Sequence, residues 1–198
     1  MDTPTIQIGM SLEEYNRLSA QEGSFEIIDG ERIPKMPQEA GHGEVIDIVR
    51  DGINGHSVGK KLGRAFSEQT FVLSYSPGGV TGSRIPDVMY YTAERLNAYK
   101  EANPDWKKKP YILVPDLVVE VVSPSDDLGE LSDKVDLYLT DGVLWVWVMD
   151  FNKETVSIHS LITLQPFTKQ QTTLKVGDTL TGGEIIPGFE IAVTRLFE

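Results

Sequence analysis

The chain has 198 residues, of which 40% are hydrophobic and 24% charged, contains no cysteine, and carries a formal net charge of −12. This length and composition are typical of one globular domain with a substantial core, which argues against a disordered chain or a disulfide scaffold. The sequence has no apolar run of about 18 residues that would span a bilayer, and its first residues lack the pattern of a secretory signal. We therefore expect a single domain over residues 1–198, located in the cytoplasm and not in a membrane.

The negative charge bears on nucleic acid as a partner, because phosphate contacts require a basic surface. Basic residues gather in two places, at Lys60, Lys61 and Arg64, and at Lys100 with residues 107–109. Solvated lysines that keep the protein soluble are the simpler interpretation. Local positive patches able to contact nucleic acid are the alternative.

The first predicted elements are a short helix and a hairpin. Ser11 precedes Glu14 by three residues, the spacing of a capping box, which predicts a helix through about Leu18. Within the strand-like stretch FEIIDGERIPKM, residues 25–36, Asp29-Gly30 is the dipeptide preferred in two-residue hairpin turns. A β-hairpin is therefore expected here.

The middle of the chain predicts a longer helix and two strands. Apolar residues recur at helical spacing from His42 to Ile53, and Gly52 and Gly55 mark the expected end of this helix. The elements expected next are strands at 65–75 and 80–91, joined at the sequence SPGG, and a helical segment at about 92–99.

The stretch at 112–123 is the densest apolar run, which predicts a central strand covered on both faces. A helix follows, with Ser125 as its expected N-cap and Gly142 as its stop, and the chain then re-enters the sheet through VLWVWVMD. Because strand, helix and strand form a crossover unit, we expect an α/β fold with a sheet of mixed strand directions.

Glu120 is a charge set in the middle of this central strand, between Val118-Val119 and Val121-Val122. A buried carboxylate costs several kcal/mol unless it is paired, hydrogen-bonded or bound to a cation. One interpretation is that a helix N-terminus or an arginine such as Arg84 satisfies it. The other is that Glu120 and Asp87, which follows Pro86 in a neighbouring strand, bind one divalent ion. Their hard oxygen ligands favour Mg²⁺ or Mn²⁺, which can activate water against a phosphodiester.

Lys134 is the third candidate residue. At about 100° per residue it lies at the flank of the apolar stripe of its helix, beside Leu131 and Tyr138, from where its side chain can reach Glu120. A simple ion pair with Glu130, four residues earlier, is the alternative.

Several segments together resemble the Uma2, or DUF820, family, which is grouped with the endonucleases of the PD-(D/E)XK superfamily. The matching segments are MSLEEYNRL, FEIIDGERI, GHGEVI, RIPDVMYYTAERL, PDLVVEVVSPSDD, DKVDLYLTDGVLWVWVMD and LTGGEIIPGFEIAV. The resemblance implies a restriction-endonuclease-like mixed central β-sheet flanked by helices, with additional N- and C-terminal strands. It also implies Mg²⁺-dependent hydrolysis of nucleic acid, DNA in particular, and we expect a homodimer.

The resemblance assigns roles residue by residue. Asp87 and Glu120 correspond to the two acids of the superfamily motif and would be the metal ligands. The usual motif lysine, two residues after Glu120, is replaced by Val122, and Lys134 corresponds to the position from which some branches supply the lysine instead. Glu26 corresponds to a further acid of the family, as a metal ligand through water or as a support for the site, with a surface carboxylate as the alternative.

Three further residues are weaker candidates. His42 also matches a family position and would act as a base or phosphate contact, although its place at a helix start equally suits a cap. Ser123 and Ser125 follow Glu120 closely and could hold a phosphate or a water at the next helix, with simple capping as the alternative.

Three functions are compatible with the sequence. The first is a metal-dependent endonuclease that uses Asp87, Glu120 and Lys134. The second is a catalytically weak or inactive nuclease-fold module that binds nucleic acid or protein, which the acidity and Val122 favour. The third is a structural or interaction domain in which the acids serve folding and the aromatic strand LWVWVMD forms a subunit contact.

Overall fold

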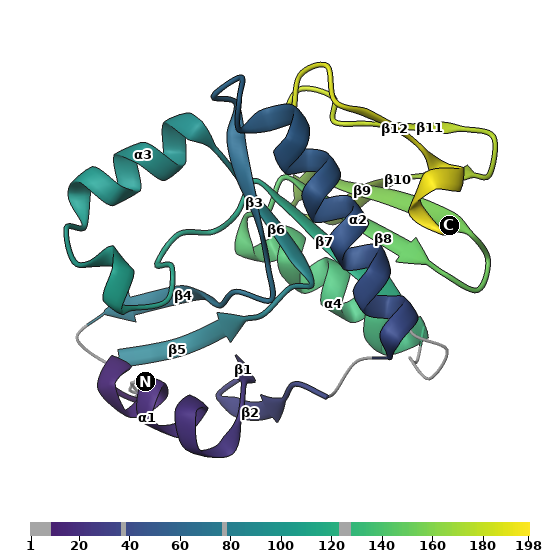
Figure 1. Ribbon diagram of the computed structural model, residues 1–198. Coiled ribbons are helices and arrows are strands. Elements are labelled where there is room, and N and C mark those ends of the chain that lie inside the picture. Colours follow the sequence, from purple (N-terminus) through teal and green to yellow (C-terminus); the bar gives the residue numbers. More distant parts are fainter. Residues whose placement is uncertain (1–8, 37–38, 77–78, 123–127) are drawn as a thin grey trace. The chain divides into compact units, whose positions relative to one another are not determined.

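A computed structural model of the protein describes residues 9–36, 39–76, 79–122 and 128–198 (Figure 1). The chain divides into two compact units. One comprises Met1–Pro37, Thr70–Ile85 and Lys100–Val114, and the other comprises Gln38–Gln69, Pro86–Tyr99 and Pro115–Glu198. We call them the small unit and the large unit and describe each separately.

The small unit is built on a four-stranded sheet with the order β2-β1-β5-β4. Its elements are α1 (Leu12–Glu22), β1 (Phe25–Ile28), β2 (Glu31–Pro34), β4 (Phe71–Ser76), β5 (Gly79–Arg84) and the 3-10 turn η1 (Trp106–Lys108). The Ser11 hydroxyl accepts a hydrogen bond from the Glu14 amide at 3.1 Å, so the predicted cap is confirmed, although the helix extends beyond Leu18. The predicted hairpin turn is also confirmed, because Asp29 and Gly30 have φ of 51° and 83°.

The large unit is built on a six-stranded sheet with the order β10-β9-β8-β7-β6-β3. Its strands are β3 (Gly63–Ser67), β6 (Val88–Thr92), β7 (Leu117–Val122), β8 (Trp145–Asp150), β9 (Thr155–Leu164) and β10 (Phe167–Lys175). Its other elements are α2 (Ala40–Ser57), the start of α3 (Ala93–Ala102), α4 (Leu128–Asp141), β11 (Thr179–Thr181), β12 (Glu190–Ala192) and the 3-10 turn η2 (Val193–Leu196). The pair β7–β8 is parallel and the other pairs of this sheet are antiparallel, which is the mixed sheet that the sequence predicts.

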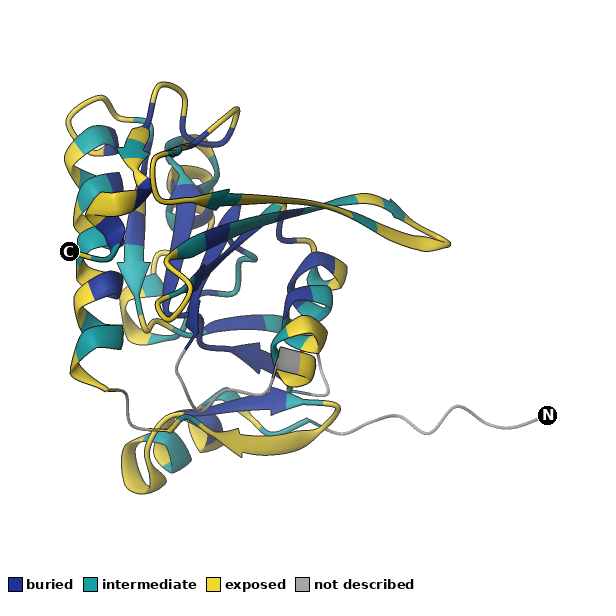
Figure 2. Ribbon diagram, turned by 90° about the vertical axis from the view of Figure 1, so that its right-hand side faces the viewer, coloured by how far each residue is buried: buried dark blue, intermediate teal, exposed yellow. Residues whose placement is uncertain are grey.

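The two faces of this sheet carry different helices (Figure 1). Leu117, Val119 and Val121 of β7 belong to a core shared with α2 and with the C-terminal segment. Val118, Glu120 and Val122 alternate with them along the strand and therefore face the other side. That side is covered by α4, which contacts β8 and β9. Figure 2 shows the middle strands of the sheet buried and the outer end of the β9–β10 hairpin exposed.

The sequence-based boundaries are wrong in several places. The helix α2 runs through Gly52 and Gly55 to Ser57, because its buried apolar face offsets the poor helix propensity of glycine. The predicted strand 65–75 is two strands in different sheets, interrupted at Glu68, which has a positive φ of 50°.

The predicted strand 80–91 is also two strands, β5 and β6, separated at Pro86, because proline lacks the amide that a ladder needs. The densest apolar run forms the shorter strand β7. The connection SPGG and the cap at Ser125 include residues outside those that the structure describes. Within the described ranges, no helix is long and apolar enough to cross a membrane.

Candidate active site

Glu120 lies in the centre of β7 and is only 5% exposed. Both of its carboxylate oxygens accept hydrogen bonds from α4: Oε2 from the Lys134 ammonium at 3.0 Å, and Oε1 from the Tyr138 hydroxyl at 2.6 Å. Lys134 and Tyr138 are four residues apart, so they lie on one side of the helix, and the Lys134 Nζ is 5.9 Å from the centre of the Tyr138 ring. The buried charge is therefore compensated by a cation and a hydroxyl of the crossover helix.

Asp87 lies directly before β6 and is 3% exposed. Its Oδ2 accepts a hydrogen bond from the Val121 amide at 2.9 Å and lies 3.3 Å from Nε2 of His42, which is also 2.8 Å from the Val121 carbonyl oxygen. In the β6–β7 register, Val88 pairs with Val119, so Val121 would face Pro86. Because proline has no amide to donate, the Val121 carbonyl accepts from the His42 side chain instead, and the Val121 amide donates to the Asp87 carboxylate.

The same register, extended by one residue, places Asp87 opposite Glu120. Asp87 Oδ2 accepts a hydrogen bond from the Val121 nitrogen, which a peptide bond of about 1.3 Å joins to the Glu120 carbonyl carbon. The Asp87 carboxylate therefore lies close to the backbone of Glu120. The two carboxylates have different helical partners, however. Asp87 contacts His42 of α2, whereas Glu120 contacts Lys134 and Tyr138 of α4.

The remaining predicted residues are placed less directly. Glu26 lies in the small unit, where its Oε1 accepts a hydrogen bond from the Ile85 amide at 2.6 Å. Its membership of the site stays a prediction. Ser123 and Ser125 lie outside the described residues. The sequence interpretation missed Tyr138, which it assigned to the apolar stripe, although its spacing of four residues from Lys134 was a usable signal.

The carboxylate oxygens of Asp87 and Glu120 are the kind of ligand that a magnesium or manganese ion prefers. Both carboxylates accept hydrogen bonds within the protein, Asp87 from the Val121 amide and Glu120 from Lys134 and Tyr138. Among the residues that the structure describes, no three histidine, aspartate or glutamate side chains form a group able to hold a metal. A pair of carboxylates is the donor set of an ion that keeps several waters and takes substrate oxygens as its remaining ligands.

A buried histidine lies on the same face of the sheet as Glu120. His159 of β9 pairs with Val146 of β8, which pairs with Val118 of β7, and directly paired residues share a face. Burial lowers the pKa of His159 below the ordinary 6.5; Lys169 on β10 lowers it further, and Asp136 on α4 opposes this effect. The folded protein therefore favours the neutral imidazole.

This histidine is expected to make the protein less stable in mild acid. The unfolded chain takes up the proton at the ordinary pKa and the folded chain only at a lower pH, so the free energy of unfolding falls as the pH drops from about 7.5 through 6.5. The loss is about 1.4 kcal/mol for each unit by which the pKa is lowered. Urea unfolding at several pH values should show that His159→Gln flattens this dependence, and an unchanged slope would contradict the assignment.

The fold defines a class of protein, the restriction-endonuclease-like proteins with a mixed central sheet flanked by helices. In this chain an acid lies in the central parallel strand and a lysine on the crossover helix. The structure is similar to the crystal structure of a "putative nuclease belonging to DUF820" from Anabaena variabilis ATCC 29413, with a TM-score of 0.74 and 18% identity over 95% of this chain and 97% of that chain. Residues 12–194 match the Uma2 family, described as "Putative restriction endonuclease", and the chain belongs to that family. No curated protein matches the sequence.

Proposed function

We propose that the protein is a metal-dependent endonuclease that hydrolyses phosphodiester bonds of DNA at the cluster around Glu120. The observation that carries the proposal is the 3.0 Å contact between Lys134 and Glu120. It brings an ammonium to the central acid although the usual lysine position, Val122, is apolar. Family membership supports nuclease chemistry in general, and the metal, the DNA substrate and the residue roles are our proposals.

In this proposal Asp87 and Glu120 hold one Mg²⁺ or Mn²⁺ ion. When bound, the ion supplies a polarised phosphoryl oxygen and a water of lowered pKa. Lys134 contributes a positive charge beside Glu120, where it can stabilise the negative charge that develops on the phosphate. Tyr138 orients the Glu120 carboxylate through Oε1, and His42 orients Asp87 in the same way.

The catalytically weak or inactive binding module is the second candidate. Two observations favour it: Val122 stands at the usual lysine position, and both Glu120 oxygens are engaged within the protein. A net charge of −12 also opposes DNA approach unless basic residues gather locally. The expected dimer and cytoplasmic location stay predictions, because neither the fold nor the family match bears on them.

Nicking of supercoiled plasmid tests the proposal. The purified protein should nick plasmid with Mg²⁺ or Mn²⁺ and not with EDTA. Lys134→Met removes the ammonium while keeping most of the side-chain volume, so the nicking rate should fall about 10²-fold or more.

The matched control for this variant is Lys175→Met, because Lys175 is an exposed lysine of the same unit. Its rate should equal that of the wild type. Nicking that is equally fast in Lys134→Met would remove this lysine from the mechanism. A wild type that cleaves neither plasmid nor oligonucleotides with either metal would leave the binding module as the function.

A further inference from the structure

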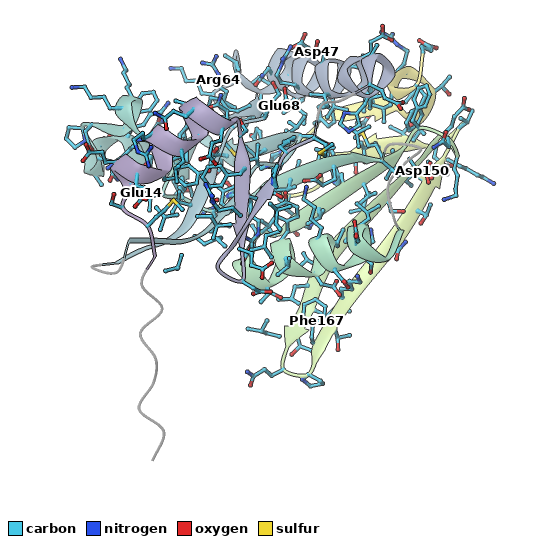
Figure 3. All side chains as sticks on the ribbon, turned by 90° about the horizontal axis from the view of Figure 1, so that it is seen from below. Glu14, Asp47, Arg64, Glu68, Asp150 and Phe167 are labelled. Atoms are coloured by element: carbon cyan, nitrogen blue, oxygen red, sulfur yellow. The ribbon has the colours of Figure 1, made fainter. Side chains whose placement is uncertain are left out.

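A hollow of about 370 Å³ lies beside α4 on the face of the large sheet that carries Glu120. Its size is within the range of small-molecule sites. Its walls come from α4 and from β7, β8, β9 and β10, with Lys153 from the turn between β8 and β9. Figure 3 shows α4 alongside the long strands of the β9–β10 hairpin, with Phe167 at the hairpin tip and Asp150 labelled near the other end of these strands.

The hollow is apolar on one side and offers hydrogen bonds on the other. The apolar side chains are Val122, Leu131, Val135 and Val148. The polar side is formed by short side chains of the hairpin, where the hydroxyls of Ser157 and Thr173 are 3.2 Å apart and the Gln171 amide reaches Thr173 at 3.5 Å. Such a lining suits a flat ligand with apolar faces and polar edges.

His159 is the buried polar group of this hollow. It is 7% exposed, and its Nδ1 has no hydrogen-bond partner among the described residues. A buried ring nitrogen without a partner costs free energy, which a ligand atom would recover. The neutral imidazole has one donor and one acceptor nitrogen, so it can bond to either type of heterocycle edge atom.

Two lysines border the hollow, each paired with a carboxylate. Lys153 Nζ lies 2.7 Å from Asp150, and Lys169 Nζ lies 2.5 Å from Asp136. Both pairs are partly exposed, so they are weak and their ammonium groups can turn to a ligand. The hollow therefore combines an apolar wall, hydrogen-bonding groups and cations. These suit the faces of a base, the edge of a base and a phosphate, which are the parts of a nucleotide.

The hollow lies next to the cluster formed by Glu120, Lys134 and Tyr138. Val148 is the register partner of Glu120, and Val122 is the next residue of β7 on the same face. On α4, Leu131 and Val135 line the hollow and belong to the apolar stripe at whose flank Lys134 lies. A ligand in the hollow would therefore lie next to the phosphate that Glu120 and Lys134 are proposed to act on.

We propose that this hollow binds the base of one nucleotide of the substrate strand, next to the scissile phosphate. The inference rests on the proposed nuclease function and adds a subsite to it. The base stacks on the apolar wall, its edge bonds to His159 and Gln171, and its phosphate faces Lys153 or Lys169. A simple anion site would need the lysines but not the apolar wall or the amide.

The test is equilibrium binding of the four 2′-deoxynucleoside 5′-monophosphates to the metal-free full-length protein by calorimetry. At least one should bind, and 2-deoxyribose 5-phosphate, which has no base, should bind much more weakly. Gln171→Ala should weaken nucleotide binding about five-fold, the value of one hydrogen bond. His159→Phe, which fills a similar volume without ring nitrogens, should do the same.

The matched control is Gln170→Ala, because Gln170 is the neighbouring glutamine of β10 and alternation along the strand directs it to the opposite face. Its affinity should equal that of the wild type. The proposal is overturned if no nucleotide binds, if the base-free sugar phosphate or inorganic phosphate binds equally well, or if both glutamine variants behave alike. Base-dependent binding without plasmid cleavage would instead contradict the nuclease function and leave the pocket standing.

Discussion

Glu120→Gln is expected to reduce plasmid nicking by about 10²-fold or more, because glutamine keeps the shape of the side chain and removes the charge that would bind the metal and pair with Lys134. The measurement is the nicking rate with Mg²⁺ and with Mn²⁺, with circular dichroism to show that the fold is retained. Cleavage at the wild-type rate would exclude Glu120 from the chemistry.

The contacts of Glu120 also set the expected change in stability. From the sequence alone, removal of the Glu120 charge is compatible with a rise in stability without metal, because it lifts the repulsion between neighbouring carboxylates. In the structure, the carboxylate is instead paired with Lys134 and hydrogen-bonded to Tyr138, so Glu120→Gln should lower the free energy of unfolding by about 1–3 kcal/mol. Unfolding in urea gives this value.

A double variant separates the structural and the catalytic roles. Glu120→Gln with Lys134→Met removes both charges, so neither is left buried without its partner. The double variant should therefore lose less stability than the two single variants lose together. Nicking should stay lost. If activity returned together with stability, the pair would serve folding alone.

Replacing Asp87 is expected to lower both stability and activity. Asp87→Ala leaves the Val121 amide without its side-chain acceptor in a buried position, which should cost about 1–3 kcal/mol and also abolish nicking. Asp87→Asn retains an oxygen that can accept this hydrogen bond, so stability should largely recover while nicking stays low, because the charge is missing.

Thermal denaturation with and without Mg²⁺ gives the complementary measurement. A metal that binds the folded protein raises the melting temperature, and we expect this rise in the wild type and its loss in both Asp87 variants. An equal rise in the wild type and in Asp87→Asn would place the metal elsewhere.

The two Asp87 variants also test the hydrogen bond to Val121. Equal stability of Asp87→Ala and Asp87→Asn would contradict the role of Asp87 as the acceptor for the Val121 amide.

The sequence predicted the central part of the fold because its signals there are local and strong. The lone acid in a strand covered on both faces, the helix that follows it and the return through VLWVWVMD define β7, α4 and β8. The position of Lys134 at the flank of its helix also followed from periodicity, and the structure has its ammonium on Glu120.

The sequence could not predict features that depend on partners distant in the chain. The division of the stretches 65–75 and 80–91 among two sheets is a matter of tertiary pairing, which propensity does not encode. The contact of His42 with Asp87 joins α2 to the residue before β6, and His159 lies near Lys169 because β9 pairs with β10. No spacing along the chain reveals such contacts.

The valine at position 122 has a consequence for the space around the site. A lysine there would project from the same face of β7 as Glu120 and would fill the volume that Val122 now borders. With the ammonium supplied from α4 instead, the end of the strand presents a short, smooth side chain. The departure from the usual motif therefore leaves room beside Glu120, which is the room that our proposal gives to the base of the substrate strand.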